Sequence, residues 1–333
     1  MFTCILSAHI KPIIALQEVR GDEISQISKH LTSTLKETTS EQPRIPTYKI
    51  SSTMSAFVQN HLQPYPALTN FVATKPLAGK TVLVTGAGRG VGAYISQQLA
   101  AAGVSRLGLV GRDRSRIETA KQTYAAEFPG TVFEAFAADV TDEAAIASVF
   151  SQFGVPDILV NNAGVFPDSG PFINEDLKAW FTGFEINVLG TAIVTQQFLR
   201  AKGPEKKAIV LNVSTLAAHF RAPLVGWSGY GSSKLAQARI FEHIRFEHPE
   251  VRFTNIHPGQ IASDGFARSG APEPAEGMTD GGMAGKFYVW AATEQADFLS
   301  GRFAWAEWDI EELKRKETEI VSKDLLRVTF EGI

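Results

Sequence analysis

The sequence predicts an α/β fold: a doubly wound parallel sheet of seven strands with helices on both faces, in a single domain with an N-terminal extension. From residue 77 onward, short apolar runs rich in Val, Ile, Leu and Phe alternate with helical patterns. Helices of this length allow right-handed crossovers between parallel strands. The apolar run 81–86 also leads directly into four glycines within seven residues, as expected at the first turn of such a sheet.

Each expected element follows from its local pattern. Continuous apolar runs are typical of strands buried on both faces, and apolar residues at helical spacing predict the segments between them. Thr141 is the expected N-cap of the third helix, with Asp142 and Glu143 in its first turn. The strands are expected at 81–86, 106–111, 132–138, 157–161, 207–213, 251–256 and 299–304. The helices are expected at 91–102, 114–127, 142–153, 175–201, 228–247 and 281–293.

The glycine-rich turn contains Gly86, Gly88, Gly90 and Gly92, and a helical pattern begins at Val91. Glycine lets the backbone turn sharply and approach a phosphate without an intervening Cβ. The helix that follows directs its free N–H groups and the positive end of its dipole at the anion. Because strand, turn and helix occur in this order, the segment indicates a dinucleotide-binding site.

The chain divides into regions of different composition. Residues 1–75 are expected to form a partly disordered N-terminal extension, because residues 32–55 are rich in Ser, Thr, Lys and Pro. Within it, Met54 is a candidate start of translation. Residues 76–310 should form the dinucleotide-binding and catalytic domain, and 311–333 a C-terminal tail. The Gly- and Pro-rich stretch 262–282 is too long for a simple connection, so we expect a substrate lid; a disordered surface insertion is the alternative.

Composition excludes several classes of function. Of 333 residues, 44% are hydrophobic and 20% charged, which is ordinary for a globular protein. A net charge of −3 and a pI of about 6.2 do not indicate a nucleic-acid partner or an anionic membrane surface. The single cysteine, Cys4, allows no internal disulfide and is expected to be inert. With no long apolar run and no clear signal peptide, we expect a cytoplasmic protein that crosses no membrane.

Four motifs, in order along the chain, together resemble the short-chain dehydrogenase/reductase family. They are the glycine turn Thr85–Gly92, Asn161-Asn-Ala-Gly164, Tyr230-Gly-Ser-Ser-Lys234 and Pro258-Gly259. The resemblance covers about residues 77–310. It implies a Rossmann-fold oxidoreductase that uses NAD(P), and a homodimer or homotetramer formed through the two long helices.

Tyr230 and Lys234 lie four residues apart, so they share a helix face. A lysine ammonium about 6 Å from the phenol, at an effective dielectric constant near 20, would favour the phenolate by about 3 kcal/mol, or about two pK units. We therefore expect the pKa of Tyr230 to move toward working pH. The resemblance implies that Tyr230 exchanges a proton with the carbonyl or alcohol oxygen, and that Lys234 also binds the nicotinamide ribose.

The resemblance also implies a catalytic hydroxyl at the end of the fifth strand. Thr215 is favoured and Ser214 is the alternative, because the family usually carries two serines here and the spacing to Tyr230 is slightly long. That hydroxyl would orient the substrate oxygen. Asn187 matches an asparagine whose backbone holds a water connected to Lys234; an ordinary polar helix residue is the alternative.

NADP is favoured over NAD. An NAD enzyme places an acidic residue about 20 residues after the glycine turn, to accept a hydrogen bond from the ribose 2′-OH. Here the second strand ends at Gly111 and Arg112, and Arg89 lies in the glycine turn. Two guanidinium groups can grip a 2′-phosphate. Asp113 is the counter-argument, because it could accept from the ribose.

The resemblance implies further cofactor contacts from residues near the strand ends. For Asp139, help in starting the next helix is the alternative. His257 has no partners at metal-ligand spacing, so we expect a structural role and no metal site. The implied contact residues are Asp139, Val140, Asn161, Ala163, Gly164, Pro258, Gly259, Ile261 and Ser263.

The expected function is an NADP(H)-dependent interconversion of a ketone or aldehyde with an alcohol on a small hydrophobic substrate. A non-redox enzyme of the same fold is one alternative, such as a dehydratase, epimerase or cyclase, since a fold does not fix a function. A non-catalytic NADP-binding regulator is the other, against which the intact Tyr230/Lys234 pair counts. The residues expected to give an apolar pocket, unless they serve only packing, are Phe166, Phe220, Trp227, Phe266, Met278 and Met283.

Overall fold

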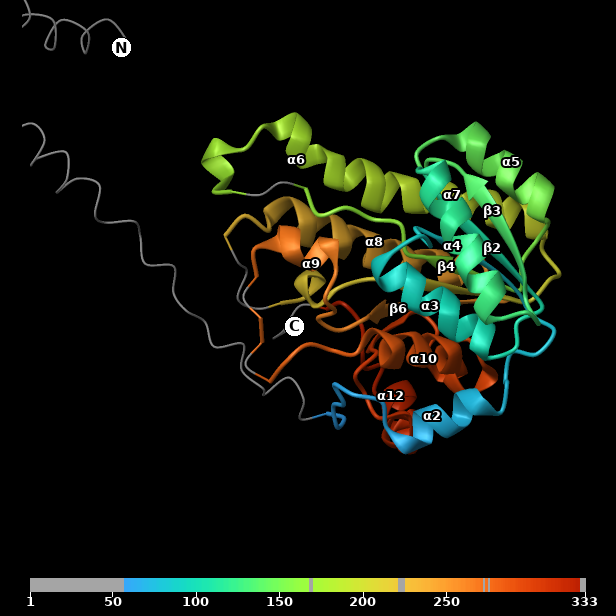
Figure 1. Ribbon diagram of the computed structural model, residues 1–333. Coiled ribbons are helices and arrows are strands. Elements are labelled where there is room, and N and C mark those ends of the chain that lie inside the picture. Colours follow the sequence, from blue (N-terminus) through green and yellow to red (C-terminus); the bar gives the residue numbers. More distant parts are fainter. Residues whose placement is uncertain (1–56, 168–169, 221–224, 272, 275, 330–333) are drawn as a thin grey trace, which may run out of the picture. The chain divides into compact units, whose positions relative to one another are not determined.

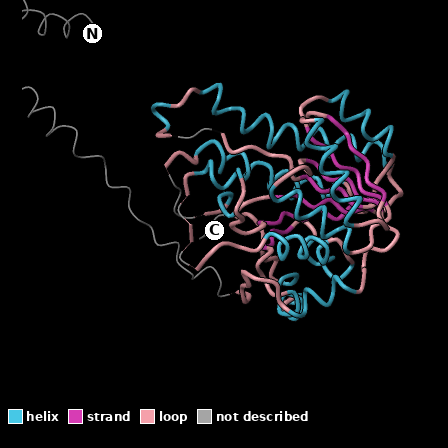
Figure 2. Tube along the Cα trace, in the orientation of Figure 1, coloured by secondary structure: helices cyan, strands magenta, loops and turns pink. Residues whose placement is uncertain are grey.

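A computed structural model of the chain describes residues 57–167, 170–220, 225–271, 273–274 and 276–329. Cys4 and Met54 lie outside these residues. One sheet of seven parallel strands, in the order β3-β2-β1-β4-β5-β6-β7, has helices on both faces (Figures 1 and 2). The predicted doubly wound fold is confirmed. None of the helices described is both long and apolar enough to span a bilayer.

Strand order reverses between β1 and β4, and such a switch point opens a crevice at the carboxyl ends of the strands. Every predicted strand occurs. The bounds are β1 Thr81–Thr85, β2 Arg106–Gly111, β3 Val132–Ala137, β4 Ile158–Asn161, β5 Ala208–Val213, β6 Val251–His257 and β7 Arg302–Trp305. The prediction for the last strand, 299–304, began three residues too early. Residues Glu294–Leu299 form a 3₁₀ helix instead, and Gly301, at a φ of 69°, makes the turn into β7.

The helices follow the predicted alternation, with additions at both ends of the described chain and after β6. Helices α4 and α8 have the predicted bounds. The bounds are α2 Pro66–Ala73, α3 Gly90–Ala101, α4 Arg114–Glu127, α5 Glu143–Phe153, α6 Leu177–Phe184, α7 Thr191–Lys202, α8 Ser228–Glu247, α9 Asp264–Ser269, α10 Gly281–Ala291, α11 Ile310–Arg315 and α12 Glu317–Ser322.

The expected N-cap of α5 was wrong by one residue. Asp142 caps the helix, and its carboxylate accepts a 2.9 Å hydrogen bond from the Ala145 amide. The Thr141 hydroxyl instead donates to Asp139 Oδ1 at 2.8 Å. The Thr141 hydroxyl is thus engaged with Asp139, and the carboxylate of the following residue, Asp142, caps the helix.

The single helix expected at 175–201 is interrupted. A π-helical turn, Glu185–Gly190, separates α6 from α7. Gly190 lies tightly against the connection between β3 and α5, since a Cβ there would come within 2.6 Å of Val140 Cγ2. The turn carries Asn187, which is fully buried. Wide turns of this kind inside helices recur at functional sites.

Two apolar clusters fill the two faces of the sheet. One includes side chains of α3, α4 and α10, and the other those of α5, α7 and α8. Residues 57–75, placed by the sequence in an extension, contribute Val58, Leu68 and Val72 to the first cluster, and α2 lies beside α10 (Figure 1). Leu313 and Ile320, from the expected tail, join the same cluster. The core thus takes in both flanks of the predicted domain.

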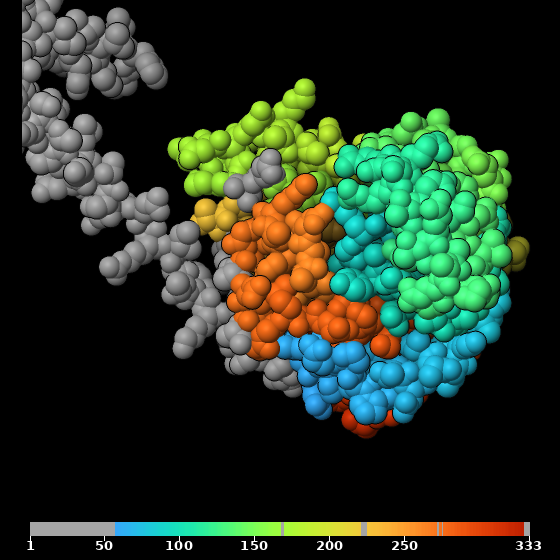
Figure 3. All heavy atoms as spheres, in the orientation of Figure 1, coloured from blue at the N-terminus to red at the C-terminus, as the bar shows by residue number. Residues whose placement is uncertain are grey.

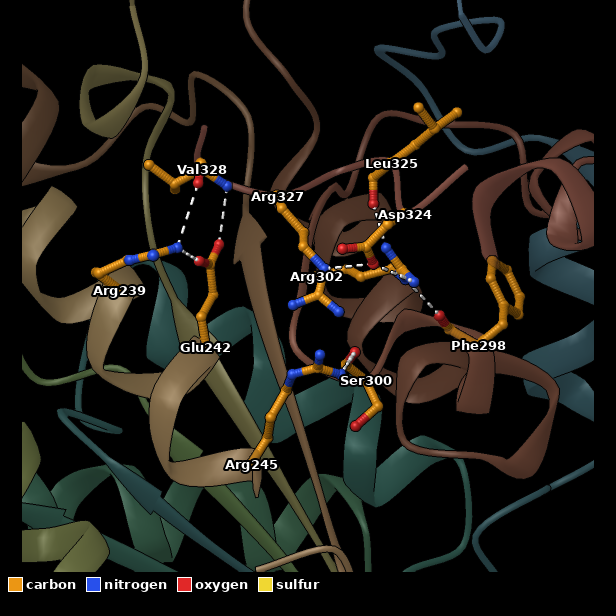
Figure 4. Close-up of polar contacts among 10 residues, drawn as sticks. All are labelled: Arg239, Glu242, Arg245, Phe298, Ser300, Arg302, Asp324, Leu325, Arg327 and Val328. Atoms are coloured by element: carbon orange, nitrogen blue, oxygen red, sulfur yellow. Dashed lines mark hydrogen bonds and ion pairs between the residues drawn. The ribbon is translucent and has the colours of Figure 1, made fainter. Parts of the chain in front are cut away.

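The residues after α12 are held against α8 and β7 by polar contacts (Figure 4). Glu242 is buried; it pairs with Arg239 and accepts a 2.8 Å hydrogen bond from the Val328 amide. Arg302, also buried, pairs with Asp324 at 3.0 Å. The end of the described chain is therefore attached to the helix that carries Tyr230 and Lys234.

Candidate active site

Two adjoining hollows open at the carboxyl ends of the strands. The cleft, about 890 Å³, runs over β1, β2, β3 and the start of α3. The inner pocket, about 190 Å³, lies between β5, α8 and the segment after β6. In Figure 3 the orange segment around α9 and the cyan-to-green segments of α3 and α4 flank the cleft. Residues lining both hollows, such as Asn162 and Gly164, connect them.

The glycine turn forms the floor of the cleft. Gly86 has a φ of 67°, and a Cβ there would lie 2.7 Å from Asn162 Nδ2. A Cβ on Gly92 would lie 2.2 Å from the Gly86 carbonyl oxygen. The first turn of α3 has no side-chain cap from its N-cap residue, Arg89, so backbone N–H groups remain available to an anion. This backbone fits the pyrophosphate of a dinucleotide.

Arginines line the rim of the cleft. Arg89 pairs with Asp264 of α9, and Arg112 lies 3.7 Å from Asp139. Burial alone would raise the pKa of Asp139, but hydrogen bonds from Thr141 and the charge of Arg112 hold it below its usual value. Arg116 and Arg268 also line the cleft and were missed in the sequence. The position of Arg116, four residues after Arg112 at the start of a helix, was a usable signal.

Gly111 and Asp113 determine whether the end of β2 can offer a carboxylate to a ribose hydroxyl. The Asp113 carboxylate caps α4, accepting a 3.1 Å hydrogen bond from the Arg116 amide, and also lies 3.7 Å from Arg116 Nε. A Cβ on Gly111 would lie 2.7 Å from Ile117 Cδ1, so an acidic side chain at that position would require Ile117 to shift. Asp113, the counter-argument to NADP, is thus committed to the helix.

Tyr230 lies in the inner pocket, with its ring centre 4.5 Å from that of Phe166. The Thr215 side chain lies close enough to the Tyr230 hydroxyl to lower its pKa. Burial raises the pKa of Tyr230 to about 12, against this lowering effect. The pair of hydroxyls marks a point at which a substrate oxygen could accept two hydrogen bonds.

Lys234 lies one turn further along α8 and is buried. Its Nζ donates to the Val213 carbonyl at 2.9 Å and to Gln237 Oε1 at 3.0 Å. Burial lowers the pKa of Lys234 to about 8. The expectation that Lys234 lowers the pKa of Tyr230 is wrong for this structure, because desolvation shifts both groups toward their neutral forms.

Ser214 and Thr215 have different surroundings, although both line the inner pocket. Thr215 contacts Tyr230 and also accepts a 3.3 Å hydrogen bond from the Ala217 amide. The Ser214 hydroxyl is buried and has no hydrogen-bond partner among the described residues.

Three asparagines near β4 take separate positions. Asn187 Oδ1 accepts from the Val165 amide at 2.9 Å, and its Nδ2 donates to Ser233 Oγ at 3.0 Å, which ties the loop after β4 to α8. Asn161 turns away from the cleft and donates to Thr195 Oγ1 at 2.9 Å. The expectation that it lines the cleft is wrong; Asn162 does so, because one residue along a strand changes the face.

The other predicted residues divide between the two hollows. His257 lines the inner pocket; burial lowers its pKa to about 3, and its ring centre lies 5.1 Å from that of Trp305. Within the described ranges no cluster of His, Cys, Asp or Glu is arranged for a metal. The cleft is lined by Gly86, Gly88, Arg89, Gly90, Val91, Arg112, Asp139, Val140, Ala163 and Gly164. The inner pocket is lined by Pro258, Gly259, Ile261 and Ser263.

The expected apolar lining is half right. Phe166, Trp227 and Phe266 line the inner pocket. Met283 does not: it is fully buried in the core, because it lies on the inner face of α10. Phe220 and Met278 are likewise absent from the described residues that line this pocket.

Comparison with known proteins gives consistent matches. A family model described as short chain dehydrogenase matches residues 80–273. The short chain dehydrogenase/reductase AacuD of Aspergillus aculeatus is 33% identical over 237 residues, covering 71% of this chain and 82% of the relative. The short chain dehydrogenase mpl6 of Monascus purpureus is 30% identical, covering 81% of this chain and 94% of the relative.

Solved structures share the fold at lower identity. A 7α-hydroxysteroid dehydrogenase complexed with NADH and 7-oxo glycochenodeoxycholic acid has a TM-score of 0.62 at 22% identity, covering 73% of this chain and 97% of that chain. A 3-oxoacyl-[acyl-carrier protein] reductase from Brucella melitensis has a TM-score of 0.65 at 20% identity, covering 74% and 96%. At these identities the similarity supports the fold alone.

Proposed function

The chain belongs to the short-chain dehydrogenase/reductase family, and we propose that it interconverts a small hydrophobic ketone or aldehyde with its alcohol, using NADP(H). The observation that carries the proposal is the hydroxyl pair Tyr230 and Thr215 in the inner pocket, where the cleft ends. A carbonyl oxygen between two hydroxyl donors is polarised and held in one orientation. A homo-oligomer in the cytoplasm is part of the same proposal.

Residues of this chain would hold the cofactor along the cleft. The bare turn from Gly86 to Gly92 and the uncapped start of α3 suit the pyrophosphate. The preference for NADP is supported by Arg89 and Arg112 on the rim, and by Gly111 at the end of β2, which offers no carboxylate to a ribose. Bound nicotinamide supplies or accepts the hydride.

The protein's own groups manage the proton. In reduction, Tyr230 would donate its hydroxyl proton to the substrate oxygen while Thr215 keeps that oxygen in place. A pKa near 12 keeps Tyr230 protonated at neutral pH, which is the form a donor needs. Lys234, bonded to the Val213 carbonyl, lies one turn away and would offset the phenolate charge that donation leaves.

The test is NADPH consumption, followed by absorbance, with a panel of apolar ketones and the matching alcohols with NADP⁺. We expect turnover with NADPH and a lower kcat/KM with NADH. The Tyr230→Phe variant serves as the negative control, since it preserves the ring contact with Phe166. Equal kcat/KM for the two cofactors would contradict the NADP preference, and turnover that survives in Tyr230→Phe would contradict the proton donor.

A further inference from the structure

The turn Pro258–Gln260 forms one wall of the inner pocket and leaves β6 just after His257. Gly259 has a φ of 92°, which favours glycine. Pro258 and Gly259 are buried and Gln260 is partly buried. A turn in this position would contact the nicotinamide end of the cofactor under the proposed function, so its shape bears on hydride transfer.

Thr279 is the residue that fixes this turn from behind. Its hydroxyl accepts a 3.0 Å hydrogen bond from the Gln260 amide, and its own amide donates to the Gln260 carbonyl at 2.9 Å. A Cβ on Gly259 would lie 2.4 Å from Thr279 Oγ1. Thr279 therefore holds the turn by two hydrogen bonds and by direct contact with the glycine.

Glu307 holds Thr279 in turn. The Thr279 hydroxyl donates to Glu307 Oε1, and both side chains are buried. The Glu307 main chain is fixed as well: its carbonyl accepts from the His61 amide, and the amide of the preceding residue, Ala306, donates to the His257 carbonyl. The carboxyl group is thus anchored beside the strand end from which the turn starts.

Glu307 has no basic partner within ion-pair distance among the described residues. Burial raises the pKa of its carboxyl group, against the lowering effect of the Thr279 hydroxyl and of the nearby Gln260 main chain, which belongs to the turn itself. Keeping an acid in such a place is costly unless its hydrogen bonds matter. An amide or an apolar side chain would serve packing equally well, so packing alone does not account for the acid.

We propose that Glu307 is a positioning residue, which acts through Thr279 to fix the turn Pro258–Gln260 at the nicotinamide end of the site. This inference rests on the proposed function for its effect on rate. The hydroxyl of Thr279 donates its proton to Glu307 and accepts from the Gln260 amide. The carboxyl group of Glu307 therefore orients the hydroxyl so that a lone pair of the Thr279 oxygen faces the turn. Displacement of reacting groups by about 1 Å can lower a rate by about 10²-fold.

The experiment uses two isosteric changes and one conservative change in the full chain. Thr279→Val removes the hydroxyl and keeps the shape; Thr279→Ser restores the hydroxyl; Glu307→Met removes the oxygen that accepts from Thr279 at a similar side-chain length. Thr131→Val is the control, because the Thr131 hydroxyl is also buried and hydrogen-bonded, at 2.8 Å to the Val104 carbonyl, but lies outside both hollows. Each variant is measured for kcat, KM, melting temperature, and affinity for NADPH and for 2′,5′-ADP.

We expect Thr279→Val and Glu307→Met to lower kcat by about 10- to 100-fold, with smaller changes in KM, while Thr279→Ser recovers most of the rate. NADPH should bind more weakly to the two impaired variants, whereas 2′,5′-ADP, which lacks the nicotinamide half, should bind as to the wild type. Thr131→Val should lose melting temperature without losing kcat.

Two results would overturn the inference. One is a kcat for Thr279→Val and Glu307→Met that follows melting temperature alone, as in Thr131→Val. The other is an equal loss of affinity for NADPH and 2′,5′-ADP, which would mean a general disturbance of the cleft. If the wild type turns over no carbonyl substrate, the proposed function fails, and the comparison of NADPH with 2′,5′-ADP still decides whether Glu307 shapes the turn.

Discussion

The cleft and the inner pocket are adjoining spaces built on different principles. The cleft, about 890 Å³, is shaped by consecutive backbone of the glycine turn and rimmed by exposed charges; the Arg112 side chain is 67% exposed. The inner pocket, about 190 Å³, is formed by side chains from separate elements, among them the buried Thr215 and Lys234 and the partly buried Tyr230. Changes in the pocket should therefore alter rates strongly, and changes on the rim should alter cofactor selectivity moderately.

The largest expected effect comes from the pocket. Tyr230→Phe removes the proposed proton donor and should lower kcat by about 10²- to 10⁴-fold. NADPH affinity, set mainly by the cleft, should change by less than about threefold. Steady-state kinetics and a fluorescence titration with NADPH measure the two. A parallel loss of affinity and rate would break the distinction between the two spaces.

The next largest effect separates the two neighbouring hydroxyls. Thr215→Val should lower kcat by about 10²- to 10³-fold, because it removes a group that holds the substrate oxygen. Ser214→Ala should change it little and leave the melting temperature equal or higher, since it removes a buried hydroxyl that has no partner among the described residues. The opposite ranking of the two variants in kcat would make Ser214 the catalytic hydroxyl.

Burial of ionisable groups in the pocket should also make the free energy of unfolding depend on pH. Lys234 titrates at about 8 when folded, against an ordinary value of 10.5, so between these values the unfolded chain binds more protons and stability rises with pH. The full shift corresponds to about 3 kcal/mol. Tyr230, raised from 10.0 to about 12, acts in the opposite direction above pH 10. Urea unfolding between pH 8 and 10 should show the rise, and Lys234→Met should abolish it.

The smallest expected effect lies on the rim of the cleft. Arg112→Gln should reduce the ratio of kcat/KM for NADPH to that for NADH by about 10-fold, because one charge-assisted contact contributes about 1.5–3 kcal/mol when not screened. Arg114→Gln is the matched control: it is a neighbouring exposed arginine that does not line the cleft. An equal change in both variants would point to general surface charge.

What could be predicted from sequence also differs between the two spaces. The glycine turn and the Tyr230/Lys234 spacing are local patterns, so their place followed from secondary structure alone. The choice between Asn161 and Asn162 depended on which residue ends the strand, and a shift of one position exchanges the faces. The link from Thr279 to Glu307 joins residues 28 positions apart, and no local pattern contains it.

Side-chain protonation was the least predictable property. The charge of Lys234 was expected to dominate the pKa of Tyr230, which is sound for a pair in a polar site. Desolvation dominates instead, because the pocket wall buries both groups. Burial is the sum of many distant contacts, including those of Phe166 from the loop after β4, so it becomes known only with the whole fold.

The packing of α2 has a consequence for synthesis of the chain. Tyr65 donates its hydroxyl to the Trp308 carbonyl, and Asn60 pairs with Trp308 as an isolated bridge. A ribosome makes these residues early and their partners more than 240 residues later. During elongation, Val58, Leu68 and Val72 must stay without the partners that cover them in the finished fold. Chaperones that cover exposed apolar side chains should therefore matter most for nascent chains stalled before β7.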